Sequence, residues 1–152
     1  MPIRLTAAVP QFTVLDVVRT AEYYRDFLGF EVLGYWDGKG ASAVGTTRSV
    51  FAIVTRDEVQ VFFNLADRPD VRTGRARNTY DAYFHMVGID ALAGELSARG
   101  ADIIDGPEDR VYKKRELVIR DCNGLILAFG EDTHHRTLTS NQHRASLRLP
   151  IF

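Results

Sequence analysis

The 152-residue sequence contains a single cysteine, Cys122. One cysteine excludes a disulfide within the chain and a metal cluster held by several thiolates. The sequence also has almost no net charge, −1 from 19 basic and 20 acidic residues. A chain without an excess of one charge has no strong field to attract nucleic acid or a membrane surface. We therefore expect neither of them as a partner.

Long apolar runs are missing as well. No stretch approaches the roughly 20 apolar residues that span a membrane, and the first residues lack the charged and then apolar pattern of a secretion signal. We therefore expect a cytoplasmic protein. The composition, 45% hydrophobic and 26% charged, is typical of a soluble globular domain with a buried core.

The sequence does contain one pattern that it uses twice. A hydrophobic strand leads into a helical stretch closed by glycine, first over residues 12–29 and again over residues 83–100. β-rich sequence follows each of these stretches. This repeat predicts two half-domains built on one plan, with a ligand site where they meet.

Each half has the predicted order βαβββ. In the first half we expect strands at 6–15, 30–36, 49–55 and 59–65, with Pro10 interrupting the first, and a helix between Asp16 and Gly29 that buries Ala21, Tyr24, Phe27 and Leu28. In the second half we expect strands at 82–86 and 101–104, a helix at 89–99, a loop at Gly106-Pro107, and a hairpin of 116–120 with 125–129 around Asn123-Gly124.

The predicted fold class is α+β, with two βαβββ modules forming a concave, cup-like mixed sheet. We expect a single domain over residues 1–132, with modules at about 6–65 and 81–131. Residues 66–80, which hold several arginines and little apolar sequence, are interpreted as the linker between the modules. Residues 133–152 are interpreted as a polar carboxy-terminal tail.

Three stretches carry a resemblance to a known family: residues 21–30, 89–101 and 115–130. In these stretches the chain resembles the vicinal oxygen chelate superfamily, which includes glyoxalase I, extradiol dioxygenases, fosfomycin-modifying enzymes and bleomycin resistance proteins. The third stretch is similar to the hairpin signature of the family, with Cys122 where proline is usual. The resemblance covers about residues 6–132 and implies the glyoxalase/bleomycin resistance fold.

Enzymes of this family hold a divalent metal with His, Gln or Glu at four positions, two in each half. Carried over from the matching motifs, these positions fall on Val9, Val61, Asp81 and Ala128. The resemblance therefore implies that this chain has no metal site and no cofactor, because valine and alanine offer no ligand atom. The alternative is a divalent metal ion at a displaced site, with His85, Asp81 and Gln11 as ligands or acid–base groups.

Strand alternation predicts which side chains line the cup. The predicted lining residues are Val9, Gln11, Thr13, Val59, Val61, Phe63, Asp81, Tyr83, His85, Ile126 and Ala128, with Tyr35 or Trp36 at the rim. An aromatic-walled cavity with few polar groups is typical of a small-molecule site, and a carboxylate beside aromatic rings suits a planar or cationic ligand.

From this lining we predict ligand-binding roles for a subset of side chains: Gln11, Thr13, Trp36, Phe63, Tyr83, His85 and Arg115. Two of these keep a structural alternative. His85 is equally consistent with a hydrogen-bonded structural role. Arg115 and its neighbour Glu116 begin a strand near the mouth of the cup, where they either contact the ligand or pair on the surface. Catalytic residues are not identified beyond the candidates His85 and Asp81.

Three functions stay open. The leading hypothesis is a metal-independent, homodimeric small-molecule binding protein that resembles bleomycin resistance proteins and sequesters its ligand between modules or subunits, a role that serves antibiotic resistance. The alternative is a glyoxalase- or dioxygenase-like lyase or oxidoreductase with a non-standard metal site. The third is a structural or regulatory module whose cup is filled by its own side chains or by the carboxy-terminal tail.

Overall fold

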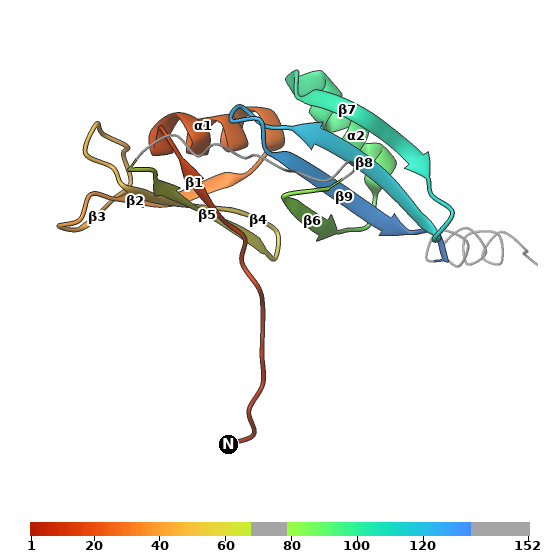
Figure 1. Cartoon of the computed structure of the whole chain (residues 1–152), viewed down its shortest axis with the longest axis horizontal. Coiled ribbons are helices and arrows are strands. Elements are labelled where there is room, and N and C mark those ends of the chain that lie inside the picture. The colour runs from red at the N-terminus through yellow and green to blue at the C-terminus, as the bar shows by residue number, and fades with distance from the viewer. Residues whose placement is uncertain (68–78, 135–152) are drawn as a thin grey trace, which may run out of the picture. The chain divides into compact units, whose positions relative to one another are not determined.

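The computed structural model describes residues 1–67 and 79–134. The chain forms two compact units, Met1–Thr79 with Cys122–Gly124, and Tyr80–Asp121 with Leu125–Phe152. Each unit holds one helix and one mixed sheet (Figure 1). The predicted α+β class with two helix-and-sheet modules is therefore confirmed. The predicted linker and tail lie mostly outside the described residues.

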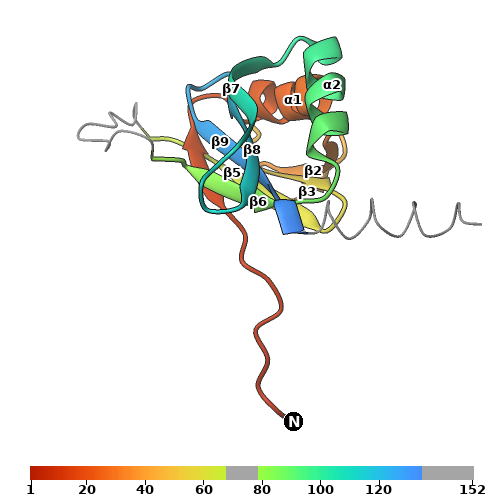
Figure 2. The same ribbon diagram turned by 90° about the vertical axis from the view of Figure 1, so that its right-hand side faces the viewer.

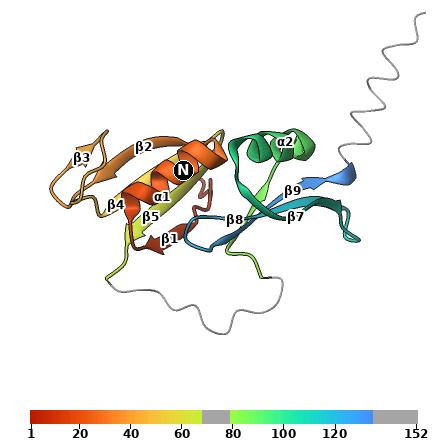
Figure 3. The same ribbon diagram turned by 90° about the horizontal axis from the view of Figure 1, so that it is seen from above.

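The first unit contains a five-stranded sheet and the helix α1 (Val17–Leu28). In sheet order the strands are β1 (Gln11–Val14), β5 (Val59–Leu65), β4 (Phe51–Arg56), β2 (Glu31–Trp36) and β3 (Ala41–Ser42). β1 is parallel to β5, and the other pairs are antiparallel. Figure 3 shows α1 lying along β4 and β5.

The helix α1 forms where its sequence provides both a start and a stop. The Asp16 side chain accepts a hydrogen bond from Arg19 N at 2.9 Å, which caps the first turn. Gly29 ends the helix in the left-handed region at φ 72°, where glycine is favoured. The buried stripe includes Tyr24, whose ring stands edge-on to Phe63 with centroids 4.8 Å apart. Phe27, which we predicted to lie on this stripe, is 37% exposed instead.

The second unit contains a four-stranded sheet and the helix α2 (Ile89–Arg99). In sheet order the strands are β6 (Ala82–His85), β9 (Ile126–Asp132), β8 (Lys114–Arg120) and β7 (Asp102–Asp109). β6 is parallel to β9, as β1 is to β5 in the first unit. The repeat in the sequence thus corresponds to a repeat in topology.

The start of α2 is capped by a side chain from the sheet. Gly88 precedes the helix and offers no side chain of its own. The buried Glu131 on β9 accepts hydrogen bonds from Gly88 N at 3.0 Å and from Ile89 N at 3.2 Å. The carboxylate meets the positive end of the helix dipole and satisfies two donors that would otherwise have no partner.

Two strand predictions were wrong in their extent. The first strand starts at Gln11 rather than at residue 6, and the carbonyl of Pro10 accepts from Phe62 N at 3.0 Å. Residues 1–10 form no regular structure and run out as an extended segment (Figure 2). In the second unit β7 continues through Pro107 where we expected a loop. Proline is tolerated there because β7 is an edge strand with shifts in its pairing register.

Each sheet has one face against its helix and one face turned away from it, which we call the distal face. In the first sheet Val61 and Phe63 are fully buried on the helix side. In the second sheet Glu131 and Arg115 contact α2, so their strand neighbours at every second position share the helix side. The alternate positions form the distal faces. No helix in the described part of the chain is long and apolar enough to cross a membrane.

The cap on α2 yields a stability prediction. Glu131→Ala removes the acceptor for two backbone donors, so we expect the free energy of unfolding to fall by about 2 kcal/mol. Glu131→Gln keeps one acceptor oxygen and should cost about 1 kcal/mol. Urea unfolding followed by circular dichroism measures both values.

The control is Glu95→Gln, which removes an ion pair to Arg99 between partly exposed side chains. We expect a change within about 0.5 kcal/mol for this variant. If Glu131→Ala were no more destabilising than Glu95→Gln, the cap would contribute nothing to α2.

Candidate functional site

A row of three aromatic rings crosses the distal face of the first sheet. Trp36 packs on Phe51 with ring centroids 5.3 Å apart, and Phe51 stands edge-on to Phe62 at 5.4 Å. All three residues are half-buried rather than buried. The Trp36 ring lies over Gly34, where an added Cβ would meet the ring at 3.5 Å. The row is therefore an apolar aromatic surface that the unit leaves partly open to solvent.

Polar side chains border this row on the strands β1 and β5. Gln11 is paired with Phe62 and Thr13 with Asn64 across the parallel ladder. Asn64 Nδ2 donates to Gln11 Oε1 at 3.3 Å, and both Gln11 and Thr13 are exposed. The structure thus places Gln11 and Thr13 on one face, as alternation predicts. Of the two rim candidates, Trp36 lies on this face and Tyr35 is buried on the other. Such a border provides donors and acceptors next to an apolar surface, the usual arrangement of a small-molecule site.

Phe63 does not belong to this face. The prediction put Val59, Val61 and Phe63 on the cup side of β5, but Val61 and Phe63 are fully buried against α1. Because side chains alternate along a strand, an error of one residue reverses the face of the whole set. The residues of β5 on the distal face are Gln60, Phe62 and Asn64.

The metal positions carried over from the family can be checked against these faces. Val61 points toward α1, so at that point of β5 the distal face offers Gln60 or Phe62 instead. Ala128 lies on the distal face of the second sheet, beside Tyr83. Asp81 precedes β6, and its carboxylate accepts from Ile126 N at 2.7 Å. Within residues 1–67 and 79–134, no three His, Cys, Asp or Glu side chains gather as a metal site.

The distal face of the second sheet holds a buried carboxylate. Glu116 is on β8, two residues before Val118, which pairs with Ala128. Its side chain is 1% exposed. Glu116 Oε1 accepts from the Tyr112 hydroxyl and from Arg110 Nε, the latter at 3.1 Å. The other oxygen, Oε2, is buried and has no hydrogen-bond partner among the described residues.

Tyr83 lies next to this carboxylate on the same face. Its ring covers Gly130, where an added Cβ would collide with the ring and hydroxyl. The hydroxyl is buried and makes no hydrogen bond of acceptable geometry among the described residues. Burial raises the pKa of Tyr83 above its ordinary value, and the neighbouring Glu116 carboxylate raises it further. Glu116 Oε2 and the Tyr83 hydroxyl are thus two polar groups without full hydrogen bonding.

The two remaining predicted residues, His85 and Arg115, lie on opposite faces of the second sheet. His85 shares the distal face with Tyr83, with ring centroids 5.2 Å apart, and is exposed. Arg115 is on the helix side, where its guanidinium pairs with Asp90 at 2.9 Å and Asp109 at 3.0 Å. The ion-pair interpretation of Arg115 is therefore the one that the geometry matches.

Sequence reasoning named Glu116 only beside Arg115, as a ligand contact or a surface pair, and it missed Arg110 and Tyr112. The prediction had Ala128 facing the cup but assigned no faces on the neighbouring strand. Once Val118 is set beside Ala128, alternation places Glu116 on the same face, so a charged residue within an apolar strand was the available signal. Arg110 and Tyr112 sit in the turn between β7 and β8, whose conformation the sequence did not predict.

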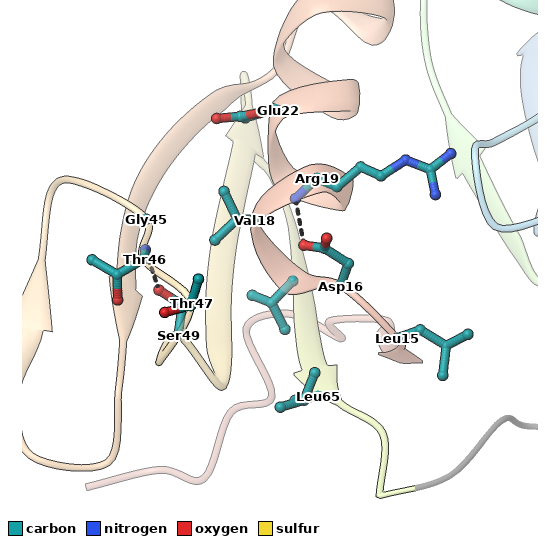
Figure 4. A pocket seen from close by; sticks show the side chains of 11 residues that line it. Leu15, Asp16, Val18, Arg19, Glu22, Gly45, Thr46, Thr47, Ser49 and Leu65 are labelled. Atoms are coloured by element: carbon teal, nitrogen blue, oxygen red, sulfur yellow. Dashed lines mark hydrogen bonds between the residues drawn. The ribbon is translucent and has the colours of Figure 1, made fainter.

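A separate pocket of about 580 Å³ opens beside the start of α1 (Figure 4). It is lined by Leu15, Asp16, Val17, Val18, Arg19, Glu22, Gly45, Thr46, Thr47, Ser49 and Leu65. The 45–49 loop lies close to α1 because position 45 is glycine: a Cβ there would be 2.7 Å from Val18 Cγ2. Two of the polar side chains are already used, since Asp16 caps α1 and Ser49 Oγ accepts from Thr46 N at 3.0 Å.

Comparison with known proteins agrees with this fold. The sequence profile of the Glyoxalase/Bleomycin resistance protein/Dioxygenase superfamily matches residues 7–129. A search of curated proteins found no match.

Several solved structures have the same fold. TioX from Micromonospora sp. ML1 is 20% identical, with a TM-score of 0.64 over 84% of this chain and 98% of that one. TnmS3, an antibiotic binding protein from Streptomyces sp. CB03234, is 18% identical, with a TM-score of 0.57 over 86% and 99%. A glyoxylase/bleomycin resistance protein/dioxygenase domain from Frankia sp. EAN1pec is 16% identical, with a TM-score of 0.61 over 88% and 99%. At these identities the likeness shows the fold alone.

The contact between Tyr112 and Glu116 yields a prediction for pH. The hydrogen bond to Glu116, helped by burial, raises the pKa of Tyr112 from 10.0 to about 12. A tyrosine whose pKa is higher in the folded state stabilises the fold below pH 10, and this contribution is lost as the pH rises toward 12. We expect Glu116→Gln to move the Tyr112 ionisation back toward pH 10.

Tyrosinate absorbance against pH measures this shift, and Tyr112→Phe identifies which step belongs to Tyr112. An unchanged titration curve in Glu116→Gln would show that the carboxylate does not control Tyr112.

Proposed function

Because the chain belongs to the Glyoxalase/Bleomycin resistance protein/Dioxygenase superfamily, we propose that it is a small-molecule binding protein that works without a metal ion. The ligand is an aromatic molecule that lies on the distal face of the first sheet. The observation that carries the proposal is the row formed by Trp36, Phe51 and Phe62. Three adjacent aromatic rings that stay half-exposed form an apolar surface whose solvent-exposed part a ligand can cover.

The energetics of this row favour a planar ligand. Covering apolar surface contributes roughly 25 cal/mol per Å², and offset or edge-on ring contacts add about 0.5–1.5 kcal/mol each. Gln11 and Asn64 at the border supply an amide pair that can exchange its mutual hydrogen bond for bonds to ligand atoms. The rings provide affinity, and the amides provide orientation.

The residues at the carried-over metal positions argue against Lewis-acid chemistry at that place. Val9 and Ala128 offer no ligand atom, and on β5 the candidates are Val61, Phe62 or Gln60. Asp81 is engaged by Ile126 N. Catalytic metal sites use about three protein ligands, and one amide with one engaged carboxylate does not reach that number.

The remaining parts of the proposal rest on the family. TnmS3 is described as an antibiotic binding protein, so sequestering an antibiotic-like molecule is a function that this fold supports. We include a homodimer and a cytoplasmic location in the proposal. The displaced metal site of His85, Asp81 and Gln11 gains no support, because the Asp81 carboxylate is bonded to the backbone of Ile126.

The stacking surface can be tested with a neutral aromatic probe, 1-naphthalenemethanol. Trp36 is the only tryptophan of the chain, so binding on this face should change the tryptophan fluorescence. Phe62→Ala removes the ring at one end of the aromatic row. The probe should then bind about tenfold more weakly, which corresponds to about 1.4 kcal/mol of binding free energy. Titration calorimetry measures the same affinities independently.

The matched control is Phe27→Ala, which removes a partly exposed ring from α1, on the other side of the sheet. Its affinity for the probe should equal that of the unmodified protein. Equal loss in both variants, or no binding of the probe at all, would contradict the proposed site.

Metal independence has its own test. We expect purified protein to contain far less than one divalent ion per chain by elemental analysis, and we expect chelation with EDTA to leave probe affinity unchanged. A stoichiometric divalent ion, together with a catalysed reaction that chelation abolishes, would overturn this part of the proposal.

A further inference from the structure

We propose that Glu116 and Tyr83 form a second binding site, on the distal face of the second sheet, for the protonated amine of an aromatic ligand. This site rests on geometry within the second unit. It extends the proposed function by naming the class of ligand. The experiments below test it independently of the proposed binding surface on the first sheet.

The first argument is the incomplete hydrogen bonding of Glu116. The side chain is 1% exposed, yet only Oε1 is held, by the Tyr112 hydroxyl and Arg110 Nε. Oε2 is buried without a partner among the described residues. A buried carboxylate oxygen normally has partners, and a missing partner in a folded protein indicates an unseen ligand or water. Because two donors hold Oε1, the position of Oε2 is fixed in advance.

A comparison with Glu131 shows how unusual this is. Both are buried glutamates of the same sheet, on neighbouring strands and opposite faces. Glu131 uses both oxygens to cap α2, at 3.0 Å and 3.2 Å. Both oxygens of Glu131 are therefore satisfied within the fold, whereas one oxygen of Glu116 can still accept a hydrogen bond.

The second argument is the charge of the surroundings. The Arg110 guanidinium is shared by three carboxylates: Glu116, Asp105 and Glu108. One cation cannot neutralise three anions, so the cluster keeps a net negative charge. A ligand cation gains from this excess, and an anion is repelled. A primary ammonium also brings up to three donors, and the Tyr83 hydroxyl can accept one of them.

The third argument is the aromatic wall. Tyr80 and Tyr83 lie with ring centroids 6.2 Å apart, and Tyr112 reaches the same carboxylate from the turn. A cation near the face of a tyrosine ring is attracted by the ring quadrupole. The rings therefore favour an ammonium attached to an apolar or aromatic body over a hydrated metal ion.

Access to the site requires one side chain to move. Glu116 Oε2 and the Tyr83 hydroxyl are closed to solvent in this structure. Tyr112, which donates to Oε1, is the side chain of the cluster that can move most easily, because it is 57% exposed and follows the fully exposed Val111 in the turn between β7 and β8. When Tyr112 swings outward, Arg110 still holds Oε1, and the ammonium can donate to Oε2.

The test uses three probes with one naphthalene ring: 1-naphthylmethylamine, 1-naphthalenemethanol and 1-naphthoate. We expect calorimetry to show that the amine binds at least tenfold more tightly than the carboxylate, with the neutral alcohol in between. In Glu116→Gln the preference for the amine should shrink to within about twofold. In Tyr83→Phe the amine should bind about fivefold more weakly, with a smaller loss in melting temperature than in Glu131→Gln, because the Tyr83 hydroxyl lies beside the Glu116 carboxylate without a hydrogen bond of good geometry.

The matched control is Glu131→Gln, a buried glutamate of the same sheet. This variant should lower the melting temperature and keep the preference for the amine. The proposal is overturned if the unmodified protein binds amine and carboxylate equally. It is also overturned if Glu116→Gln and Tyr83→Phe lower the melting temperature as Glu131→Gln does and leave the preference unchanged, since a purely structural role predicts that result.

The proposed stacking surface on the first sheet is tested by a different pattern of results. Phe62→Ala should reduce binding of the neutral alcohol and leave the ratio of amine to carboxylate affinity unchanged. A loss of the ratio without a loss of alcohol binding points to Glu116 alone, and the reverse points to the aromatic row alone.

Discussion

The parallel pairing of β1 with β5 decides what the first unit can present to a ligand. Gln11 lies beside Phe62 in this ladder, and Phe12 lies beside Phe63. The second pair is buried against α1, and its packing on Tyr24 fixes the position of the helix. With that face anchored, alternation leaves Phe62 on the other side, next to Phe51. A slip of one residue would exchange the apolar core with the aromatic row.

The two buried glutamates of the second sheet also differ according to the face of the sheet on which they lie. Glu131 faces α2 and completes a helix, while Glu116 faces away and is held at one oxygen only. Removing a carboxylate from water is costly unless hydrogen bonds replace the water. At Glu131 the fold supplies all of them. At Glu116 the fold supplies part of them, as expected where stability is given up for binding.

The sequence was sufficient for the helices and for most strands. Asp16, Gly29 and Gly100 mark helix ends through local chemistry that depends on a few neighbouring residues. The face of Phe63 and the role of Asp81 were not accessible, because both depend on pairing between strands far apart in the chain. The same holds for Glu116, whose partners Arg110 and Tyr112 come from a turn that the sequence leaves undefined. Gln11 and Thr13 share one face of β1 because alternation there is regular, whereas Trp36 was expected only as one of two candidates for the rim.

The acidic edge strand β7 has a consequence for self-association. Asp102, Asp105, Glu108 and Asp109 lie along this strand, Pro107 interrupts its donors, and its register shifts twice. Charges, proline and irregular pairing are the means by which proteins keep a sheet from adding another strand. A second copy of the chain that approached β7 would meet the same four carboxylates. Together with the proline and the irregular register, these side chains disfavour the addition of a further strand at this edge.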